Sequence, residues 1–335
     1  MTETRNSEAG SFFSKALRRQ AIAAGILAAL FATPASAKEF ISIGGGGTGG
    51  TFNTLASGIG SYLTKTISGV KFTVEGSAGS TENIRRIGSG DLQMGIAFSG
   101  DSYFAYNGLE AFKDTGAVKN IRFVGFLYSA VSQLVVSKAS GIGSLAGLKG
   151  KSISVGSAGS GTAKTMDRIL DHLKLTGDVR TSNVGGSGSS DQLKNGQIDA
   201  YHGQWGVPAG AVIETTSAVE ATLVSSYDEL NDAGFMEAFP FYSKVVIPAG
   251  TYKGVDQDVT TIRDAGILVV GADVSAEIVY DVLKNLYSDE GLKHMLAVSN
   301  ATREMGKENG LIGASIPLHP GAEKFWSEMG MLPAK

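Results

Sequence analysis

Glycine and small hydroxyl residues are concentrated in one short stretch of this chain. The sequence ISIGGGGTGGTF, residues 41–52, runs from an apolar β-type segment into four glycines and then into threonines that could begin a helix. Because glycine has no Cβ, its backbone N–H group can approach a bound anion closely, and the N-terminus of a helix attracts negative charge. The stretch therefore predicts a loop that binds an anionic ligand.

Three later segments repeat this chemistry. Each is rich in Gly, Ser or Thr, follows an apolar run and precedes a candidate helix; they are EGSAGSTEN at 75–83, GSAGSGT at 156–162 and NVGGSGSSDQ at 183–192. The carboxyl ends of parallel strands lie at one edge of a sheet, which is where α/β proteins bind their ligands. We therefore expect the four loops to converge on one cleft.

The first 37 residues have the features of an export signal. Lys15, Arg18 and Arg19 precede an apolar run at 21–32, and a small-residue cleavage site, Ala-Ser-Ala, follows at 35–37. The apolar run is short for a membrane span. The alternative, a buried or interfacial helix, would require neither the basic cluster nor the cleavage site. We expect residues 1–37 to be removed and the mature protein to reside in the periplasm.

The composition excludes several classes of protein. The chain of 335 residues has a formal net charge of −3 and no basic run, which argues against a nucleic-acid partner. It has no cysteine, so disulfides, thiolate metal sites and cysteine nucleophiles are excluded. Its 4 histidines are scattered without metal-binding spacing. We expect neither a metal nor a cofactor.

Two nucleotide-binding motifs are matched only in part. Gly44, Gly46 and Gly49 satisfy G-x-G-x-x-G after a strand, and Glu75 ends the next strand, where a dinucleotide fold has its ribose-binding acid. An exported protein would find little free NAD, which weighs against this interpretation. Residues 156–163 resemble a P-loop, but threonine and alanine stand where the phosphate-binding lysine and the Mg²⁺-binding hydroxyl are required.

Hydrophobic periodicity indicates alternating strands and helices. The predicted strands are 40–43, 70–74, 94–98, 121–128, 133–136, 151–155, 181–184, 198–201, 242–247 and 266–270. The predicted helices are 52–67, 83–87, 103–109, 163–173, 190–195, 209–215, 276–286, 290–296 and 323–329. This alternation is typical of parallel sheets with helices on their faces. The segment between the strands at 121–128 and 133–136 is the predicted first crossing to a second lobe.

Several sequence blocks together resemble the TAXI family, the extracytoplasmic solute-binding subunits of TRAP transporters. The blocks are ISIGGGGTGGTF, residues 79–108, VGSAGSGT before a helix, IPAGTY at 247–252 and IPLHPGAEKFW at 316–326, and they span nearly the whole mature chain. The resemblance implies an α/β fold, the two-lobe type II periplasmic-binding-protein fold with hinge strands. It divides the chain into a signal peptide at 1–37, the first part of lobe I at 38–128, lobe II at 129–240, and a hinge return with C-terminal helices completing lobe I at 241–335.

The resemblance also implies the ligand class and the partner. A monomeric receptor would close on a small organic anion, such as glutamate, 2-oxoglutarate or a related carboxylate, and deliver it to the membrane subunits of a TRAP permease, without being an enzyme. The ligand-binding residues that it implies are Gly47, Thr48, Gly49, Gly50, Thr51, Ser80, Asn83, Ser99, Asp101, Ser160, Gly161, Thr162, Gly206, Val207 and Pro208. Gly186 and Ser187 are additional candidates.

Alternatives stay open for individual residues and for the function. Asn83 could cap a helix, and Asp101 could cap a helix or meet an ammonium group, since a carboxylate repels an anion. Arg85 or Arg86 could bind a carboxylate or could face solvent. Another class of periplasmic binding protein with a different ligand is one functional alternative. A secreted hydrolase with Ser187 as nucleophile is the other, although the surrounding glycines match the nucleophile motif only in a shifted frame.

Overall fold

The computed structural model describes residues 39–48 and 50–332. The predicted signal peptide at 1–37 therefore lies outside the described residues, as does Gly49. Within the described part of the chain, no helix combines the length and the apolar character needed to cross a membrane.

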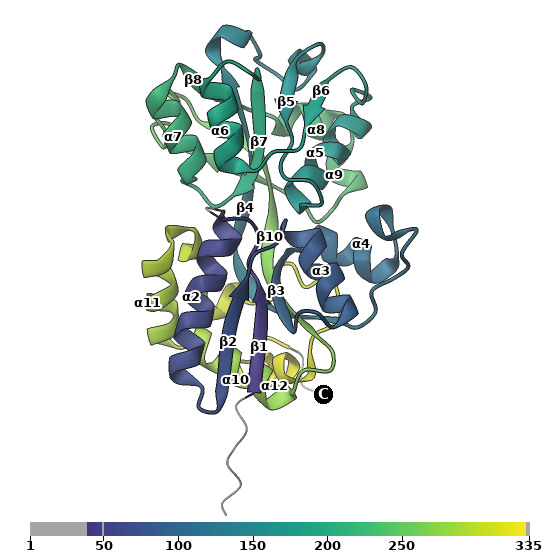
Figure 1. Ribbon diagram of the computed structural model, residues 1–335, viewed down its shortest axis with the longest axis vertical. Helices are drawn as coiled ribbons and strands as arrows, with labels where there is room; N and C mark the ends of the chain where they lie inside the picture. Colours follow the sequence, from purple (N-terminus) through teal and green to yellow (C-terminus); the bar gives the residue numbers. More distant parts are fainter. Residues whose placement is uncertain (1–38, 49, 333–335) are drawn as a thin grey trace, which may run out of the picture. The chain divides into compact units, whose positions relative to one another are not determined.

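A single mixed β-sheet runs through the described chain (Figure 1). Its strand order is β2-β1-β3-β10-β4-β7-β5-β6, with β9 added beside β10 and β8 beside β4. The strands are β1 Glu39–Gly44, β2 Val70–Glu75, β3 Met94–Phe98, β4 Ile121–Ser137, β5 Ser152–Ser154, β6 Arg180–Ser182, β7 Ala200–Trp205, β8 Ala221–Val224, β9 Ser243–Ile247 and β10 Val259–Gly271. The β1–β3, β5–β6 and β5–β7 pairs are parallel, as the alternation predicts.

The long strands β4 and β10 join two halves of this sheet. In the first half, β10 pairs with β3 through residues 266–270. In the second half, residues 131–136 of β4 pair with β7, while residues 259–263 of β10 pair with β9. We call the part built on β1, β2 and β3 lobe I and the part built on β5, β6, β7, β8 and β9 lobe II. Strands β4 and β10 are the hinge strands, and the residue boundaries of the lobes given above stay predictions.

The predicted interruption between residues 128 and 133 is wrong, because β4 is one continuous strand. Ser129 and Ala130 pair with Ala265 and Asp264 of β10, so the ladder continues through the crossing. These small polar or weakly apolar residues lower the apparent β-propensity of the segment, but the pairing with β10 holds it extended. The first crossing to lobe II is therefore a strand and not a loop.

Helices cover both faces of each half-sheet. Lobe I has α2 Thr51–Thr66, α3 Ser80–Ser89, α4 Ser99–Asn107, α10 Ala276–Leu286, α11 Asp289–Val298 and α12 Pro320–Glu328. Lobe II has α5 Gly161–His172, α6 Gly186–Lys194, α7 Gly210–Ala218, α8 Tyr227–Asp232 and α9 Phe235–Ala238. Two apolar clusters pack in each lobe, one on each face of its half-sheet. Elements β8, α8 and α9 have no counterpart in the predicted element set.

Several helices begin earlier than their hydrophobic periodicity predicts, among them the four that follow or contain a Gly/Ser-rich stretch. α3 begins at Ser80 instead of 83, α4 at Ser99 instead of 103, α5 at Gly161 instead of 163, and α6 at Gly186 instead of 190. Gly and Ser are poor residues for a helix interior, but the first turn makes few internal hydrogen bonds and tolerates them. The loop residues that we expected near a ligand are therefore helix N-termini.

Candidate functional site

The Gly-rich loops meet at a cleft of about 550 Å³, a volume typical of small-ligand sites. Lobe I contributes residues 46–48, 50–52, 54 and 78–80, together with Phe98, and Ser299 also lines the cleft. Lobe II contributes residues 156–157, 160–162, 184–188, 205 and 208–211. Tyr128 of β4 and Gln204 of β7 also line the cavity, and we call these two residues the cleft floor. The structure thus brings all four predicted loops to one cavity.

Five helix N-termini line this cleft. The first residues of α2, α3, α5, α6 and α7 are Thr51, Ser80, Gly161, Gly186 and Gly210, and all five line the cavity. Only α5 has a side-chain cap, because Ser160 Oγ accepts a hydrogen bond from the Ala163 N–H group at 3.1 Å. The other four helices have no side-chain cap hydrogen bond. Their first-turn N–H groups can therefore bind an anion.

The cleft has no formal charge of its own. Among the described residues that line it, none is Asp, Glu, Lys, Arg or His. The described chain also has no group of three or more His, Cys, Asp or Glu residues that could hold a metal ion. The electrostatic character of the site is therefore set by backbone N–H groups and helix dipoles, which favour negative charge.

Most of the predicted site residues line the cleft. They are Gly47, Thr48, Gly50, Thr51, Ser80, Ser160, Gly161, Thr162 and Pro208, together with Gly186 and Ser187. Some of their hydroxyl groups are engaged within the protein: Ser80 Oγ accepts from the Phe98 N–H group at 2.9 Å, and Thr51 Oγ1 accepts from the Gly206 N–H group at 3.4 Å. No hydrogen bond of the Thr48 or Thr162 hydroxyl is seen within the described chain, so both are available to a ligand.

Other predicted residues lie outside the lining of this cleft. Asn83 is buried and donates through Nδ2 to the backbone oxygens of Gly44 (3.1 Å) and Ile96 (2.9 Å), so it ties the end of β1 to the middle of β3. Ser99 Oγ donates to the backbone oxygen of Gly313 at 2.9 Å. Their contact with a ligand stays a prediction that this geometry does not favour.

The turn at residues 206–207 joins the lobes instead of lining the cavity. The Gly206 N–H group donates to Thr51 of lobe I, and the Val207 backbone oxygen accepts from the Arg303 guanidinium at 3.0 Å. Arg85 and Arg86 also lie away from the cleft, because Arg85 donates to the Ala111 backbone oxygen and Arg86 pairs with a glutamate, Glu75. Gly206, Val207, Arg85 and Arg86 are all absent from the lining of the cavity.

The sequence-based assignment missed the two residues of the cleft floor. Tyr128 and Gln204 are almost completely buried, yet Tyr128 Oη and both polar atoms of the Gln204 amide have no hydrogen-bond partner in the described chain. Burial and, secondarily, the nearby Asp264 raise the pKa of Tyr128 well above its usual value, so its hydroxyl stays protonated and can donate. No sequence feature distinguishes Gln204, because the predicted strand ends at residue 201 and the glutamine follows a histidine and a glycine.

An ion cluster joins the two lobes beside the cleft. Arg168 of α5 donates from Nη2 to Asp101 Oδ1 of α4 at 2.8 Å and forms a second ion pair with Glu110 at 2.8 Å. Its Nη1 atom also donates to the Tyr242 hydroxyl at 3.0 Å. The Arg168 and Asp101 side chains are only 6% and 2% exposed. Asp101 Oδ1 therefore faces a protein cation, Asp101 Oδ2 has no partner in the described chain, and the residue lies outside the lining of the cleft.

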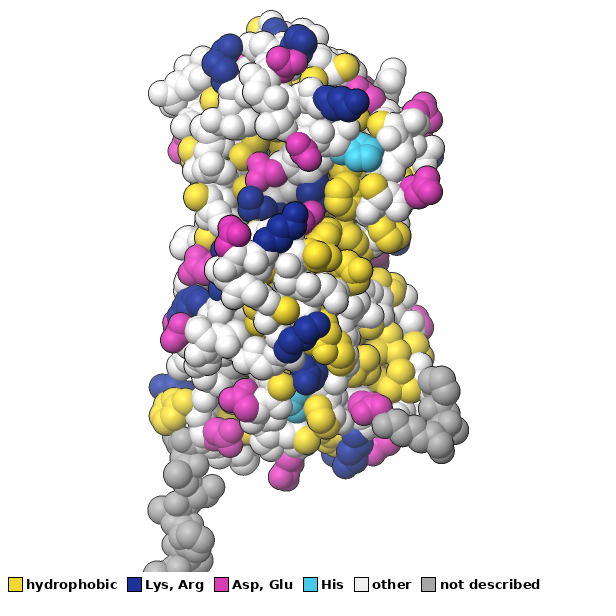
Figure 2. All heavy atoms as spheres, turned by 90° about the vertical axis from the view of Figure 1, so that its right-hand side faces the viewer, with side chains coloured by type: hydrophobic (Ala, Val, Ile, Leu, Met, Phe, Trp, Pro, Cys, Tyr) yellow, Lys and Arg dark blue, Asp and Glu magenta, His cyan; other side chains and the backbone are white. Residues whose placement is uncertain are grey.

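Aromatic side chains extend this contact between the lobes. The Phe104 ring of α4 lies 5.4 Å from the Phe241 ring and 6.4 Å from the Phe239 ring of lobe II, measured between centroids. The Arg168 guanidinium lies 4.6 Å from the Phe104 centroid. Figure 2 shows apolar side chains gathered at mid-height on this face, at the level of α4 and α9. The lobes therefore meet here through an apolar contact that surrounds a buried ion cluster.

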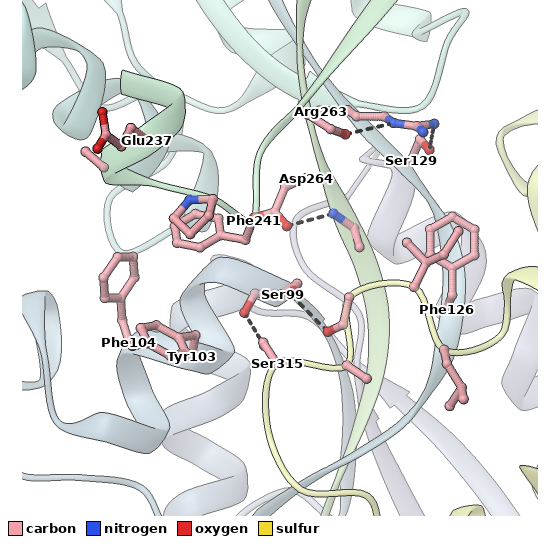
Figure 3. Close-up of a pocket in the computed structure, with 18 residues that line it drawn as sticks. Ser99, Tyr103, Phe104, Phe126, Ser129, Glu237, Phe241, Arg263, Asp264 and Ser315 are labelled. Atoms are coloured by element: carbon pink, nitrogen blue, oxygen red, sulfur yellow. Dashed lines mark hydrogen bonds between the residues drawn. The ribbon is translucent and has the colours of Figure 1, made fainter. Parts of the chain in front are cut away.

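A second and larger cavity, of about 850 Å³, lies beside this contact (Figure 3). Its polar groups are largely used within the protein: Ser99 bonds to Gly313, Ser315 Oγ donates to the Ser99 backbone oxygen at 2.8 Å, and Arg263 donates to Ser129 at 2.8 Å. Asp264 accepts from the backbone N–H groups of Gly100 (3.3 Å) and Ala265 (2.7 Å). Although it is smaller, the Gly-rich cleft is the better ligand site, because its floor carries unpartnered polar atoms.

The raised pKa of Asp264 should make the stability of the protein depend on pH. Burial, reinforced by Asp101, raises its pKa from 3.8 to about 8. The folded state therefore retains a proton that the unfolded state has already lost, so stability falls as pH rises toward 8. Burial lowers the pKa of His202 from 6.5 to about 4. Its titration therefore makes stability rise with pH, but only between about pH 4 and 6.5, below the range in which Asp264 is tested.

We expect the free energy of unfolding to fall by about 1 to 2 kcal/mol between pH 6.5 and 8, relative to the Asp264→Asn variant. Urea denaturation of both proteins at the two pH values measures this difference. Identical pH profiles for parent and variant would contradict the assignment of the titration to Asp264.

Two of the solved structures that share this fold superpose over most of this chain. The periplasmic binding protein BugD superposes with a TM-score of 0.53 at 13% sequence identity, over 88% of this chain and 94% of that chain. A protein assigned as an L-cystine ABC transporter from Listeria monocytogenes superposes with a TM-score of 0.50 at 18% identity, over 79% of this chain and 99% of that chain. Identities this low bear on the fold alone. The predicted two-lobe α/β fold of periplasmic binding proteins is confirmed.

Sequence comparison identifies the family. The family model described as the NMT1-like family matches residues 43–330. This match begins in β1, includes all four Gly-rich loops and ends after α12. The protein therefore belongs to the NMT1-like family.

Proposed function

We propose that this protein is a periplasmic solute-binding receptor that captures a small organic anion and delivers it to a membrane transporter. The observation that carries this proposal is the convergence of five helix N-termini, four of them without a side-chain cap, on a cleft whose described lining has no charged side chain. Such a site holds a carboxylate through backbone N–H groups and hydroxyls. The hinge strands would allow two lobes to close on it.

The more specific proposal is that the ligand is glutamate, 2-oxoglutarate or a related carboxylate and that the partner is a TRAP permease. Its support is the resemblance of the Gly-rich and IPLHPGAEKFW blocks to the TAXI family. Uptake by the cognate membrane subunits in proteoliposomes tests the partner. An ion gradient should drive transport without ATP, whereas uptake that requires ATP would contradict the TRAP assignment.

Isothermal titration of residues 38–335, stripped of bound ligand, tests the receptor function. Glutamate, 2-oxoglutarate, succinate, glutamine and a neutral sugar form the panel. We expect saturable binding of at least one carboxylate and none of the sugar. Absence of binding to every acid would contradict the carboxylate proposal.

Removal of single hydroxyl groups from the cleft should weaken this binding. We expect Thr48→Ala and Thr162→Ala each to weaken binding by about 1 to 3 kcal/mol, while the thermal unfolding midpoint stays within a few degrees of the parent. Thr66→Ala is a matched control, because Thr66 lies at the far end of α2 and donates to the Tyr62 backbone oxygen. Parent-like affinity in both cleft variants would refute the placement of the ligand.

The hydrolase alternative gains no support from the site. Ser187 lines the cleft, but no hydrogen bond from its hydroxyl to a histidine is seen in the described chain. The serine–histidine pair that does form joins Ser132 Oγ to His202 Nε2 at 2.9 Å, and both side chains are buried outside the lining of the cavity. No Asp or Glu of the described chain bonds to His202 Nδ1, so no acid orients this pair as a catalytic triad requires.

A further inference from the structure

The cleft floor carries three buried polar atoms that have no hydrogen-bond partner in the described chain. Gln204 lies opposite Ser132 in the β4–β7 ladder, and Tyr128 lies four residues before Ser132 on the same strand. Because side chains alternate along a strand, Tyr128 and Gln204 project from the same face. Both line the cleft and are at most 1% exposed, yet Tyr128 Oη and the Gln204 Nε2 and Oε1 atoms have no partner in the described chain.

Buried polar atoms are nearly always hydrogen bonded to protein or to ordered water, so a ligand that displaces water from the cleft floor must offer these three atoms groups of matching type. Gln204 Nε2 and the Tyr128 hydroxyl donate, and they match the oxygens of a carboxylate or a keto group. Gln204 Oε1 can only accept, and no oxygen of a carboxylate or keto group satisfies it. The buried end of the ligand must therefore supply a hydrogen-bond donor as well as acceptors.

An ammonium group is a poor candidate for this donor. The described lining of the cleft contains no carboxylate, and five helix N-termini favour negative charge there. Two acids lie outside this lining: Asp264 accepts from two backbone N–H groups, and Asp101 pairs through Oδ1 with the buried Arg168 cation, which offsets its charge although its Oδ2 atom has no partner in the described chain. Burying an unpaired cation in such a site is strongly unfavourable. A hydroxyl group supplies the donor without a positive charge.

We infer that the cleft prefers a 2-hydroxy carboxylate over the amino acid of the same carbon skeleton, and that Gln204 is the residue that determines this preference. The ligand hydroxyl donates to Gln204 Oε1, while Gln204 Nε2 and Tyr128 Oη donate to the ligand oxygens. A 2-oxo acid accepts from the two donors but leaves Gln204 Oε1 unpaired. Its affinity should therefore lie between those of the 2-hydroxy acid and the amino acid. This inference rests on the proposed carboxylate-binding function.

The test compares ligands that differ only at carbon 2. The ligand-stripped protein is titrated with 2-hydroxyglutarate, 2-oxoglutarate and glutamate, and with the four-carbon series malate, oxaloacetate and aspartate. In whichever series binds, we expect the hydroxy acid to bind most tightly and the amino acid to bind about tenfold or more weakly. An amino acid that binds as tightly as its hydroxy analogue overturns the inference but leaves the receptor function standing. No binding in either series overturns the proposed function itself.

Variants at position 204 assign the preference to this side chain. Gln204→Leu keeps the approximate volume and should reduce the affinity for the hydroxy acid about tenfold. Gln204→Glu places a carboxylate in the cleft lining, where it can pair with a ligand ammonium group. This variant should therefore bind the amino acid better relative to the hydroxy acid than the parent does. Gln192→Leu is the matched control and should bind like the parent, because Gln192 Oε1 is also buried without a partner but the residue lies outside the cleft lining. Thermal unfolding verifies that each variant is folded, and parent-like selectivity in both Gln204 variants overturns the assignment.

Discussion

Replacing Arg168 by alanine is expected to lower the free energy of unfolding by about 3 to 5 kcal/mol. The substitution leaves Asp101, which is 2% exposed, without its counterion and also removes the ion pair with Glu110. An uncompensated buried charge costs far more than the loss of an exposed ion pair. Urea denaturation followed by circular dichroism measures the change.

Lys164→Ala is the matched control on the same helix. Lys164 pairs with Asp167 at 2.9 Å, but the two side chains are 34% and 51% exposed, so its loss should cost less than about 1 kcal/mol. The double variant Arg168→Met with Asp101→Asn should recover part of the lost stability, because it removes both charges together. An Arg168→Ala variant as stable as Lys164→Ala would mean that the cluster does not hold the lobes together.

Gly161→Ala is expected to weaken ligand binding about tenfold or more. A Cβ at Gly161 would lie 2.2 Å from Asp101 Oδ2, 2.6 Å from a ring carbon of Phe98 and 2.9 Å from Ser80 Cβ, all in lobe I. The N-terminus of α5 would have to move away from lobe I, and its N–H groups would move with it. Isothermal titration with the best-binding carboxylate measures the loss.

Gly210→Ala controls for the general effect of a methyl group in the cleft. Gly210 is the first residue of α7 and lines the same cavity, but nothing in the described chain lies within 4 Å of a Cβ built there. We expect this variant to bind nearly as the parent does. Equal affinities of the Gly161 and Gly210 variants would show that close approach of α5 to lobe I is unnecessary for binding.

The local sequence is sufficient to predict the strand and helix order and the ligand loops. Alternating hydrophobic periods locate most elements, and the helix 276–286 is predicted with the bounds that α10 has. Glycine-rich stretches after apolar runs locate the loops at the cleft, because small residues there permit close approach of backbone to ligand. These features depend on a few neighbouring residues and can therefore be predicted without knowledge of tertiary contacts.

The tertiary structure alone decides what each polar side chain does. Asp101 and Ser80 are both candidate ligand residues in the sequence, but Asp101 pairs with Arg168, which is 67 residues away, and Ser80 bonds to the backbone of β3. The continuity of β4 likewise depends on its partner β10 and not on its own residues. Gln204 appears unremarkable until its burial and missing partners are known. The sequence by itself therefore determines the fold class and the chemistry of the loops, whereas pairing and burial between distant residues determine which side chains remain available to a ligand.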